Sequence, residues 1–328
     1  MTDSSLQGAT VLVTGGHGFL GKAVLRELAR VGAHAVAPTH ADLEVRDPTA
    51  VSRGFSSVCP DVVIHLAARV GGIGANQLHP GTFWRDNLLM GVNVLEAARV
   101  ARVKRVVIVG TVCAYPKFTP VPFRESALWE GYPEETNAPY GVAKRALWTG
   151  LDAYHREFGL AGAYLLPANM YGPDDDFDLE TSHVIPAMIR KFDDAVRTGA
   201  REVSLWGTGA PTREFLYVDD CAEALVIAAA TIDDPEPMNV GTGQEIRMDA
   251  LALRVAAATG FEGAVRWDAS RPDGQPRRAL DTSRARERLG WSARTDLTTG
   301  LARTVAWFRQ AGTSARGVGV PSASGAVR

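Results

Sequence analysis

The sequence predicts an α/β protein built on a doubly wound parallel sheet, with a smaller mixed α/β lobe added to it. First, a short β-branched run at 10–14 ends in glycines and is followed by apolar residues at helical spacing. Second, strand and helix patterns keep alternating as far as residue 166, which is typical of a parallel sheet. Third, three predicted strands end in short polar or small-residue stretches, and such sheets bind ligands at the carboxyl ends of their strands.

The elements of this sheet follow one another through the first half of the chain. Apolar residues between 20 and 31 recur at helical spacing, and further helices are expected near 87–100 and over 140–158. The strand ends at 65–68, 110–113 and 167–170 should meet at one crevice, because they leave the same edge of the sheet. The predicted strands are 10–14, 33–37, 61–66, 105–109 and 163–166.

The alternation loosens after Pro173, where an acidic loop at 174–178 and a helix opening at Ser182 are predicted. Asp219 and Asp249 are expected to cap two later helices, because an aspartate can accept hydrogen bonds from the first N–H groups of a helix. The remaining predicted elements are strands at 202–206 and 215–218, helices ending at 230 and 259, and a final helix at 296–310.

These elements divide the chain into two interleaved parts and a tail. Residues 8–172 and 212–243 are expected to form a dinucleotide-binding domain of the Rossmann type. Residues 173–211 and 244–310 are expected to form a substrate-binding lobe. The small, polar residues at 311–328 predict a disordered tail.

Composition narrows the class of protein. The 328 residues carry a net charge of −2, which gives no global reason to bind nucleic acid or an anionic membrane. The N-terminus lacks the apolar core of a signal peptide, and no apolar run approaches the ~20 residues that span a bilayer. Cys59, Cys113 and Cys221 are odd in number and scattered, so neither a disulfide nor a metal framework is expected. We therefore expect a cytoplasmic protein that binds no metal, nucleic acid or membrane.

Two motifs carry chemistry. Tyr140 and Lys144 stand four residues apart, so on a helix they share one face and can exchange a proton with an oxygen that is being reduced or oxidised. Alone, this spacing is more often a solvated helix face. Gly15, Gly18 and Gly21 follow a predicted strand and open a helix, which is the setting for close approach of a pyrophosphate to a helix N-terminus. An ordinary strand-to-helix turn is the plainer interpretation of those glycines.

Taken in order, the glycine loop, Thr111, Tyr140 and Lys144 resemble the extended short-chain dehydrogenase/reductases. The similarity goes further, to the GDP-L-fucose synthases, and covers roughly residues 10–310 in one collinear order. The matching stretches begin at His65-Leu-Ala-Ala, Cys113-Ala-Tyr-Pro-Lys, Thr136-Asn-Ala-Pro-Tyr, Asn169-Met-Tyr-Gly-Pro, Ser182-His-Val-Ile-Pro, Trp206-Gly-Thr-Gly, Arg213-Glu-Phe and Pro272-Asp-Gly.

The resemblance implies a homodimer that uses NADP(H) and performs two reactions in one site. Epimerisation at C3 and C5 of GDP-4-keto-6-deoxy-D-mannose comes first, and hydride reduction of the C4 ketone to GDP-L-fucose follows. Helices near 87–100 and 140–158 could form the bundle of such a dimer. The resemblance also implies that Cys113 and His183 are the base and acid of epimerisation, that Thr111 and Tyr140 hold the C4 oxygen, and that Lys144 keeps the tyrosine acidic.

Further site residues are carried over by position, and each has a plainer structural interpretation, such as core packing for Trp206 or a solvated charge for Lys191. The expected cofactor contacts are Gly15, His17, Gly18, Phe19, Leu20, Gly21, His40, Asp42, Leu43, Leu66, Ala67, Ala68, Tyr140, Lys144, Pro167, Asn169, Met170 and His183. The expected substrate contacts are Asn169, Lys191, Trp206, Arg213 and Arg278.

Departures from the family pattern leave alternatives open. His17 and His40 stand where some members place arginines that hold a 2′-phosphate, so NAD(H) remains an alternative cofactor. Val112 and Cys113 replace the Asp-Glu pair of dehydratase relatives, which argues against water loss. Two rival functions remain: the same chemistry on another GDP-4-keto sugar, such as a deoxy-heptose, and a catalytically silent nucleotide-binding protein.

Overall fold

The computed structural model describes residues 5–179, 181–271 and 273–315, and its centre is a parallel sheet. Within these residues six strands pair side by side in the order β2-β1-β3-β4-β5-β9, every pair parallel. The predicted fold class is confirmed. The strands are β1 (Thr10–Thr14), β2 (His34–Val36), β3 (Val62–His65), β4 (Arg105–Val109), β5 (Gly162–Pro167) and β9 (Pro237–Val240).

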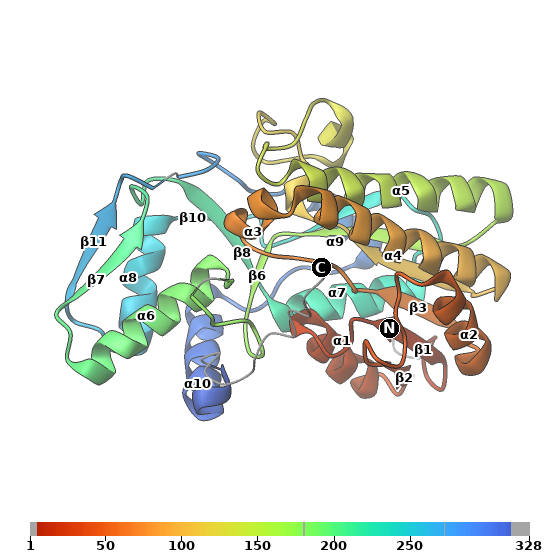
Figure 1. The fold of residues 1–328 in the computed structure, drawn as a ribbon, viewed down its shortest axis with the longest axis horizontal. Coiled ribbons are helices and arrows are strands. Elements are labelled where there is room, and N and C mark those ends of the chain that lie inside the picture. The colour runs from red at the N-terminus through yellow and green to blue at the C-terminus, as the bar shows by residue number, and fades with distance from the viewer. Residues whose placement is uncertain (1–4, 180, 272, 316–328) are drawn as a thin grey trace, which may run out of the picture.

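Helices cover both faces of this sheet (Figure 1). On one face α1 (Phe19–Arg30) packs against α7 (Val218–Thr231), and on the other α4 (Pro80–Val100) packs against α2 (Pro48–Val58) and α5 (Ala138–Phe158). Because both faces are covered, the strands are continuously apolar rather than alternating, as in the fully buried Val106, Val107 and Ile108 of β4. Since helices cover both faces of the sheet, a ligand can approach the strands only at their ends.

A second, smaller group of elements lies beside the sheet, at the left of Figure 1. It contains two short sheets, β10-β8-β6 and the parallel pair β11-β7. Its helices enclose a separate apolar core that includes Phe177, Phe192 and Phe308. The elements are β6 (Asn169–Tyr171), α6 (Val184–Thr198), β7 (Glu202–Trp206), β8 (Thr212–Tyr217), β10 (Glu245–Arg247), α8 (Met248–Thr259), β11 (Ala264–Asp268) and α10 (Leu297–Ala315).

Two predicted helix caps are wrong. Helices α7 and α8 each begin two residues earlier than expected, with Tyr217 and Arg247 as N-cap residues, so Asp219 and Asp249 lie inside the first turn. A carboxylate there still favours the helix, because it faces the positive end of the helix dipole. Asp47 caps α2 instead, accepting a hydrogen bond from the Thr49 amide at 2.8 Å.

Other elements were not predicted or start elsewhere. Helix α4 begins at Pro80 rather than near residue 87, since the proline fits the first turn. Helix α2 and strands β6, β9, β10 and β11 escaped prediction because they are short or lack a clear apolar period. So did the short helices α3 (Ile73–Leu78), η1 (Val112–Ala114), η2 (Glu125–Trp129) and α9 (Ser283–Leu289).

The predicted tail is only partly within the described residues. Residues 311–315 continue α10 past Gly312, whose backbone is not helical (φ 58°, ψ −130°), and residues 316–328 lie outside the described part. The expected boundaries of the domain and the lobe stay a prediction. No helix among the described residues is long and apolar enough to cross a membrane, and the expected cytoplasmic location stays a prediction too.

Candidate active site

A cavity of about 1280 Å³ opens at the carboxyl ends of the sheet strands. Gly15 after β1, Ala67 after β3, Thr111 after β4 and Asn169 after β5 all line it. The strand ends predicted to share one crevice do share it. The cavity also reaches the smaller lobe, where His183 at the start of α6 and Arg213 on β8 line the far side.

The glycine loop forms one end of the cavity, and its shape requires glycine. Gly15 has φ +74°, and a Cβ there would lie 2.7 Å from the Ala67 amide nitrogen. A Cβ on Gly21 would lie 2.3 Å from the Gly15 carbonyl oxygen. Helix α1 begins after Gly18, which supplies no side chain to cap it. Its first N–H groups are therefore suited to an anionic ligand, and the loop fits the pyrophosphate of a dinucleotide.

Two histidines line the same end of the cavity as the glycine loop. His17 and His40 line the cavity, and their rings contact the Ala37 carbonyl and Glu44, each at 2.9 Å. Asp42, expected at the cofactor, is not among the lining residues and its carboxylate accepts the Thr39 hydroxyl at 2.6 Å. This part of the prediction has no geometric support.

Three arginines that the sequence analysis missed surround one carboxylate near the same end. Asp86, nearly inaccessible on α4, accepts hydrogen bonds from Arg46, Arg69 and Arg85. Two of these arginines and Asp86 line the cavity. Burial raises the pKa of Asp86, but the surrounding guanidinium groups lower it more, so the carboxylate stays ionised. No spacing in the sequence indicates this cluster, because it joins three separate segments.

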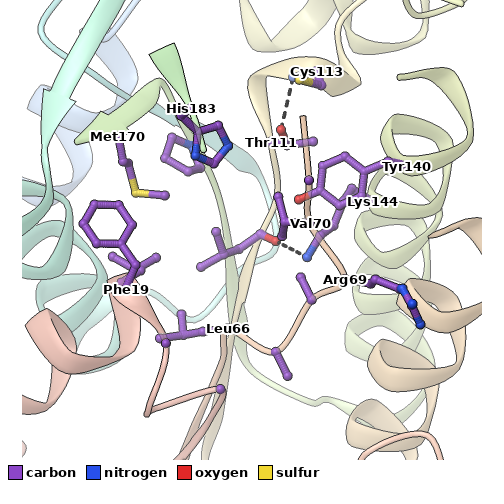
Figure 2. Close-up of a pocket in the computed structure, with 18 of the residues that line it drawn as sticks. Phe19, Leu66, Arg69, Val70, Thr111, Cys113, Tyr140, Lys144, Met170 and His183 are labelled. Atoms are coloured by element: carbon purple, nitrogen blue, oxygen red, sulfur yellow. Dashed lines mark hydrogen bonds between the residues drawn. The ribbon is translucent and has the colours of Figure 1, made fainter. Parts of the chain in front are cut away.

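The predicted tyrosine and lysine lie on one wall with Thr111. Figure 2 shows Tyr140 and Lys144 on α5 pointing toward the segment that follows β4. Burial raises the pKa of Tyr140 above its ordinary value, the nearby Cys113 raises it further, and a hydrogen bond with Thr111 acts in the opposite direction. The phenol is therefore protonated at neutral pH, as a proton donor to a ketone oxygen must be.

Lys144 does not contact the phenol oxygen in the way that the sequence spacing suggests. Its ammonium donates a hydrogen bond to the Val109 carbonyl at 2.9 Å and lies 5.9 Å from the centre of the Tyr140 ring. The physical reason is burial: inside the protein the ammonium needs an acceptor, and the end of β4 offers one. Burial also lowers the pKa of Lys144 to about 8.

Cys113 and His183 line the same cavity from different segments. Cys113 lies in η1, and its amide donates to the Thr111 hydroxyl at 3.2 Å. His183 stands at the N-cap of α6, across the cavity from Tyr140 in Figure 2. Burial lowers the pKa of His183, while Asp176 raises it by a smaller amount, so the ring is mainly neutral at pH 7. The pair can flank one ligand.

Of the five expected substrate residues, three line the cavity and two do not. Asn169, Arg213 and Arg278 line it. Lys191 instead donates to the Ser204 carbonyl at 3.0 Å, and Trp206 is 65% exposed with the Arg271 guanidinium 4.9 Å from its ring centre. Neither of these two residues packs in a core, so the plainer interpretation of Trp206 as a core residue is wrong.

Asp175 and Gln275 are further cavity residues that sequence reasoning missed. Burial raises the pKa of Asp175 to about 7, and its Oδ2 has no hydrogen-bond partner within the described residues. Gln275 follows the Pro-Asp-Gly motif and is almost inaccessible. The Pro-Asp-Gly motif indicated that this segment belongs to the site. A single sequence does not show which side chains of the segment point into the cavity.

Comparisons with known proteins agree with this geometry. Residues 11–241 match the NAD dependent epimerase/dehydratase family. GDP-L-fucose synthase 1 of Arabidopsis thaliana is 41% identical over 309 residues, which cover 94% of each chain. The structure of a GDP-L-fucose synthetase from Naegleria fowleri bound to NADP has a TM-score of 0.88 at 29% identity, covering 94% of this chain and 95% of that one. A GDP-6-OMe-4-keto-L-xylo-heptose reductase from C. jejuni has a TM-score of 0.86 at 26% identity, with 92% and 98% covered.

Proposed function

The chain belongs to the NAD-dependent epimerase/dehydratase family and, within it, to the GDP-L-fucose synthases, and on that premise we propose how its residues act. The reaction is epimerisation at C3 and C5 of GDP-4-keto-6-deoxy-D-mannose, followed by NADPH-dependent reduction of the C4 ketone to GDP-L-fucose. The observation that carries this proposal is that Cys113, His183, Tyr140 and Lys144 line one cavity.

The cofactor is NADP(H), as the resemblance implies, and the glycine loop fits it. The first N–H groups of α1 bind the pyrophosphate, and Lys144 holds the nicotinamide ribose. His17 and His40 line the cavity, and under this proposal they would donate hydrogen bonds to the 2′-phosphate. When bound, the cofactor supplies the hydride that reduces C4.

Epimerisation uses the two groups that flank the sugar. Protons on carbons next to a ketone become removable when the ketone oxygen is stabilised as an enolate, and Thr111 and Tyr140 are suited to hold that oxygen. Cys113, as the thiolate, takes the proton from one face of the carbon, and His183, in the imidazolium form that is in equilibrium with its neutral ring, returns a proton to the opposite face. The configuration inverts because the proton leaves and arrives on different sides.

Reduction then uses the buried wall of the site. Tyr140 gives its proton to the C4 oxygen, since burial keeps the phenol protonated until the alkoxide forms. Lys144, whose ammonium is bonded to the Val109 carbonyl, supplies positive charge near the phenol during this proton transfer. Arg213 binds the diphosphate of the GDP-sugar, because a guanidinium group pairs with phosphate oxygens in a fixed fork.

We also propose that the protein acts as a homodimer through α4 and α5. These helices pack against each other, and their outer faces expose apolar side chains, including Trp84, Leu89, Val92 and Phe158. Exposed apolar residues gathered on adjoining helices are typical of subunit interfaces. Sedimentation velocity tests this: a mass near twice 35.1 kDa supports the dimer, and a monomer at micromolar concentration contradicts it.

One experiment tests the function directly. The purified protein is incubated with GDP-4-keto-6-deoxy-D-mannose and either NADPH or NADH, and the product is identified by NMR. GDP-L-fucose formed faster with NADPH is the expected result. NADPH that binds but is never oxidised with any GDP-4-keto sugar would contradict the enzyme assignment and support a silent nucleotide-binding protein.

A second function has one observation in its favour. The likeness to the heptose reductase extends over nearly the whole chain, so the same chemistry on a GDP-4-keto deoxy-heptose is the alternative. Competition between the two sugars in the same assay distinguishes them. A higher kcat/KM with the heptose would make the fucose pathway secondary.

A further inference from the structure

The side chain of Cys113 lies against a guanidinium. Arg278 donates a hydrogen bond from Nη1 to the Cys113 sulfur, with 3.7 Å between the two atoms. The cysteine backbone is fixed separately, because its amide is bonded to the Thr111 hydroxyl. A sulfur in η1 is therefore paired with a cation from a segment 165 residues later in the chain.

Gln275 determines where this guanidinium points. Its side-chain oxygen accepts two hydrogen bonds from Arg278, from Nε at 2.9 Å and from Nη2. Its amide nitrogen donates to the Lys117 carbonyl at 2.7 Å, which ties it to the loop that follows Cys113. Since one edge of the guanidinium is held by Gln275, the remaining nitrogen is directed at the sulfur. Gln275 is only 6% exposed, so water competes little for these bonds.

A second guanidinium makes this part of the cavity cationic. Arg213 donates to two backbone carbonyls, those of Thr212 at 2.7 Å and Asp273 at 3.1 Å. Burial is the main cause that lowers the pKa of Arg213 to about 10, and the positive charge of the neighbouring Arg278 contributes a smaller part. Among the described residues neither arginine forms a salt bridge with a carboxylate. An anion between them is favoured, because it offsets two partly desolvated positive charges.

We propose that Arg278, oriented by Gln275, is a positioning residue that holds Cys113 as a thiolate. The role rests on the proposed function, in which the thiolate removes a proton from the sugar. In that step the C–H bond breaks and an S–H bond forms. The electron pair of the C–H bond moves into the enolate, whose oxygen Thr111 and Tyr140 hold. The negative charge thus passes from sulfur to substrate, and Arg278 contacts the sulfur on which the charge lies before the step.

Alkylation by iodoacetamide tests this without substrate or cofactor, because the thiolate is the reacting form of a cysteine. Every variant of the full chain carries Cys59→Ser, since Cys59 is exposed, and peptide mass mapping reports modification of Cys113 alone. Arg278→Met should lower the second-order rate constant at pH 7 about tenfold, through loss of the opposite charge. Arg278→Lys keeps the charge and should recover most of the rate, and Gln275→Ala should fall between the two.

The matched control is Arg277→Met. Arg277 is the next residue, but it is exposed and pairs with Glu245, so its loss should leave the alkylation rate unchanged. Wild-type rates for both Arg278→Met and Gln275→Ala would overturn the proposal. Should Arg278→Met fail to fold by circular dichroism, Gln275→Ala carries the decision, and a wild-type alkylation rate in that variant would overturn the proposal. A failure of the proposed function is distinguishable, because it would appear as absent NADPH oxidation while the alkylation rates still differ.

Discussion

The two walls of the cavity hold their side chains in different ways. Thr111, Tyr140 and Lys144 come from the end of β4 and from α5, and the tyrosine and lysine are buried in the main domain. On the other wall His183 and Arg213 belong to α6 and β8, outside the six-stranded sheet. The first wall is part of a packed core, whereas the second is assembled from separate segments.

This difference matches two chemical tasks. Proton delivery to a ketone oxygen requires one fixed distance, and a helix packed on a sheet provides it. Holding a diphosphate and a thiolate requires positive charge that faces the ligand, which Arg213 and Arg278 supply from loop and strand positions. Reduction, which needs Tyr140 as the proton donor, and epimerisation, which needs Cys113 and the guanidinium beside it, should therefore be separable by single substitutions.

The largest expected effect comes from Tyr140→Phe on the packed wall. Loss of the phenolic proton should slow NADPH oxidation about 10³-fold, because Tyr140 is the group that transfers a proton to the C4 oxygen in the proposed mechanism. Deuterium exchange from solvent at C3 and C5 should persist in part. Tyr132→Phe is the control, since Tyr132 is 65% exposed. Undiminished reduction in Tyr140→Phe would remove this residue from the role.

Cys113→Ser should separate the two reactions in the opposite sense. A serine hydroxyl is a much weaker acid than a thiol, so deuterium uptake at C3 and C5 should fall about 10²-fold, and ketone reduction should fall less. Mass spectrometry of the recovered sugar nucleotide measures the uptake. The exposed Cys59→Ser is the control. Uptake at the wild-type rate would show that Cys113 is not the base.

Glu214→Gln tests how β8, which carries Arg213 of the second wall, is held to the segment that follows β9. The buried Glu214 carboxylate accepts hydrogen bonds from the amides of Gly243 at 2.9 Å and Leu280 at 2.7 Å. An amide cannot accept on both sides, so we expect the free energy of unfolding in urea to fall by about 2 kcal/mol. Glu262→Gln, at an exposed position, serves as the comparison. Equal stability of the two variants would mean that other contacts hold β8 in place.

The smallest expected effect is a pH dependence of NADPH affinity. Burial lowers the pKa of Lys144 to about 8, so its positive charge is present below pH 8 and is lost as the pH rises through that value. The dissociation constant, measured by NADPH fluorescence, should be about threefold higher at pH 9 than at pH 7. The same ratio in Lys144→Met would assign the dependence to another group.

The sequence predicted the parts of the molecule whose cause is local. The glycine loop follows from backbone geometry, and the pairing of Tyr140 with Lys144 follows from helical periodicity. Strands β3 and β4 of the main sheet were found because both faces are buried and the apolar runs are continuous. Short strands such as β6 and β10 were missed, since three residues carry too little pattern.

By itself the sequence determined the fold class, the family and the wall that carries Tyr140, because these depend on spacing along one chain. Only the tertiary structure decided that Lys144 turns to the Val109 carbonyl, that Asp42, Lys191 and Trp206 lie off the cavity, and that Arg278 meets the Cys113 sulfur. Such contacts join segments far apart in sequence. They are selected by burial, which requires each enclosed polar group to find whatever partner the folded chain brings near.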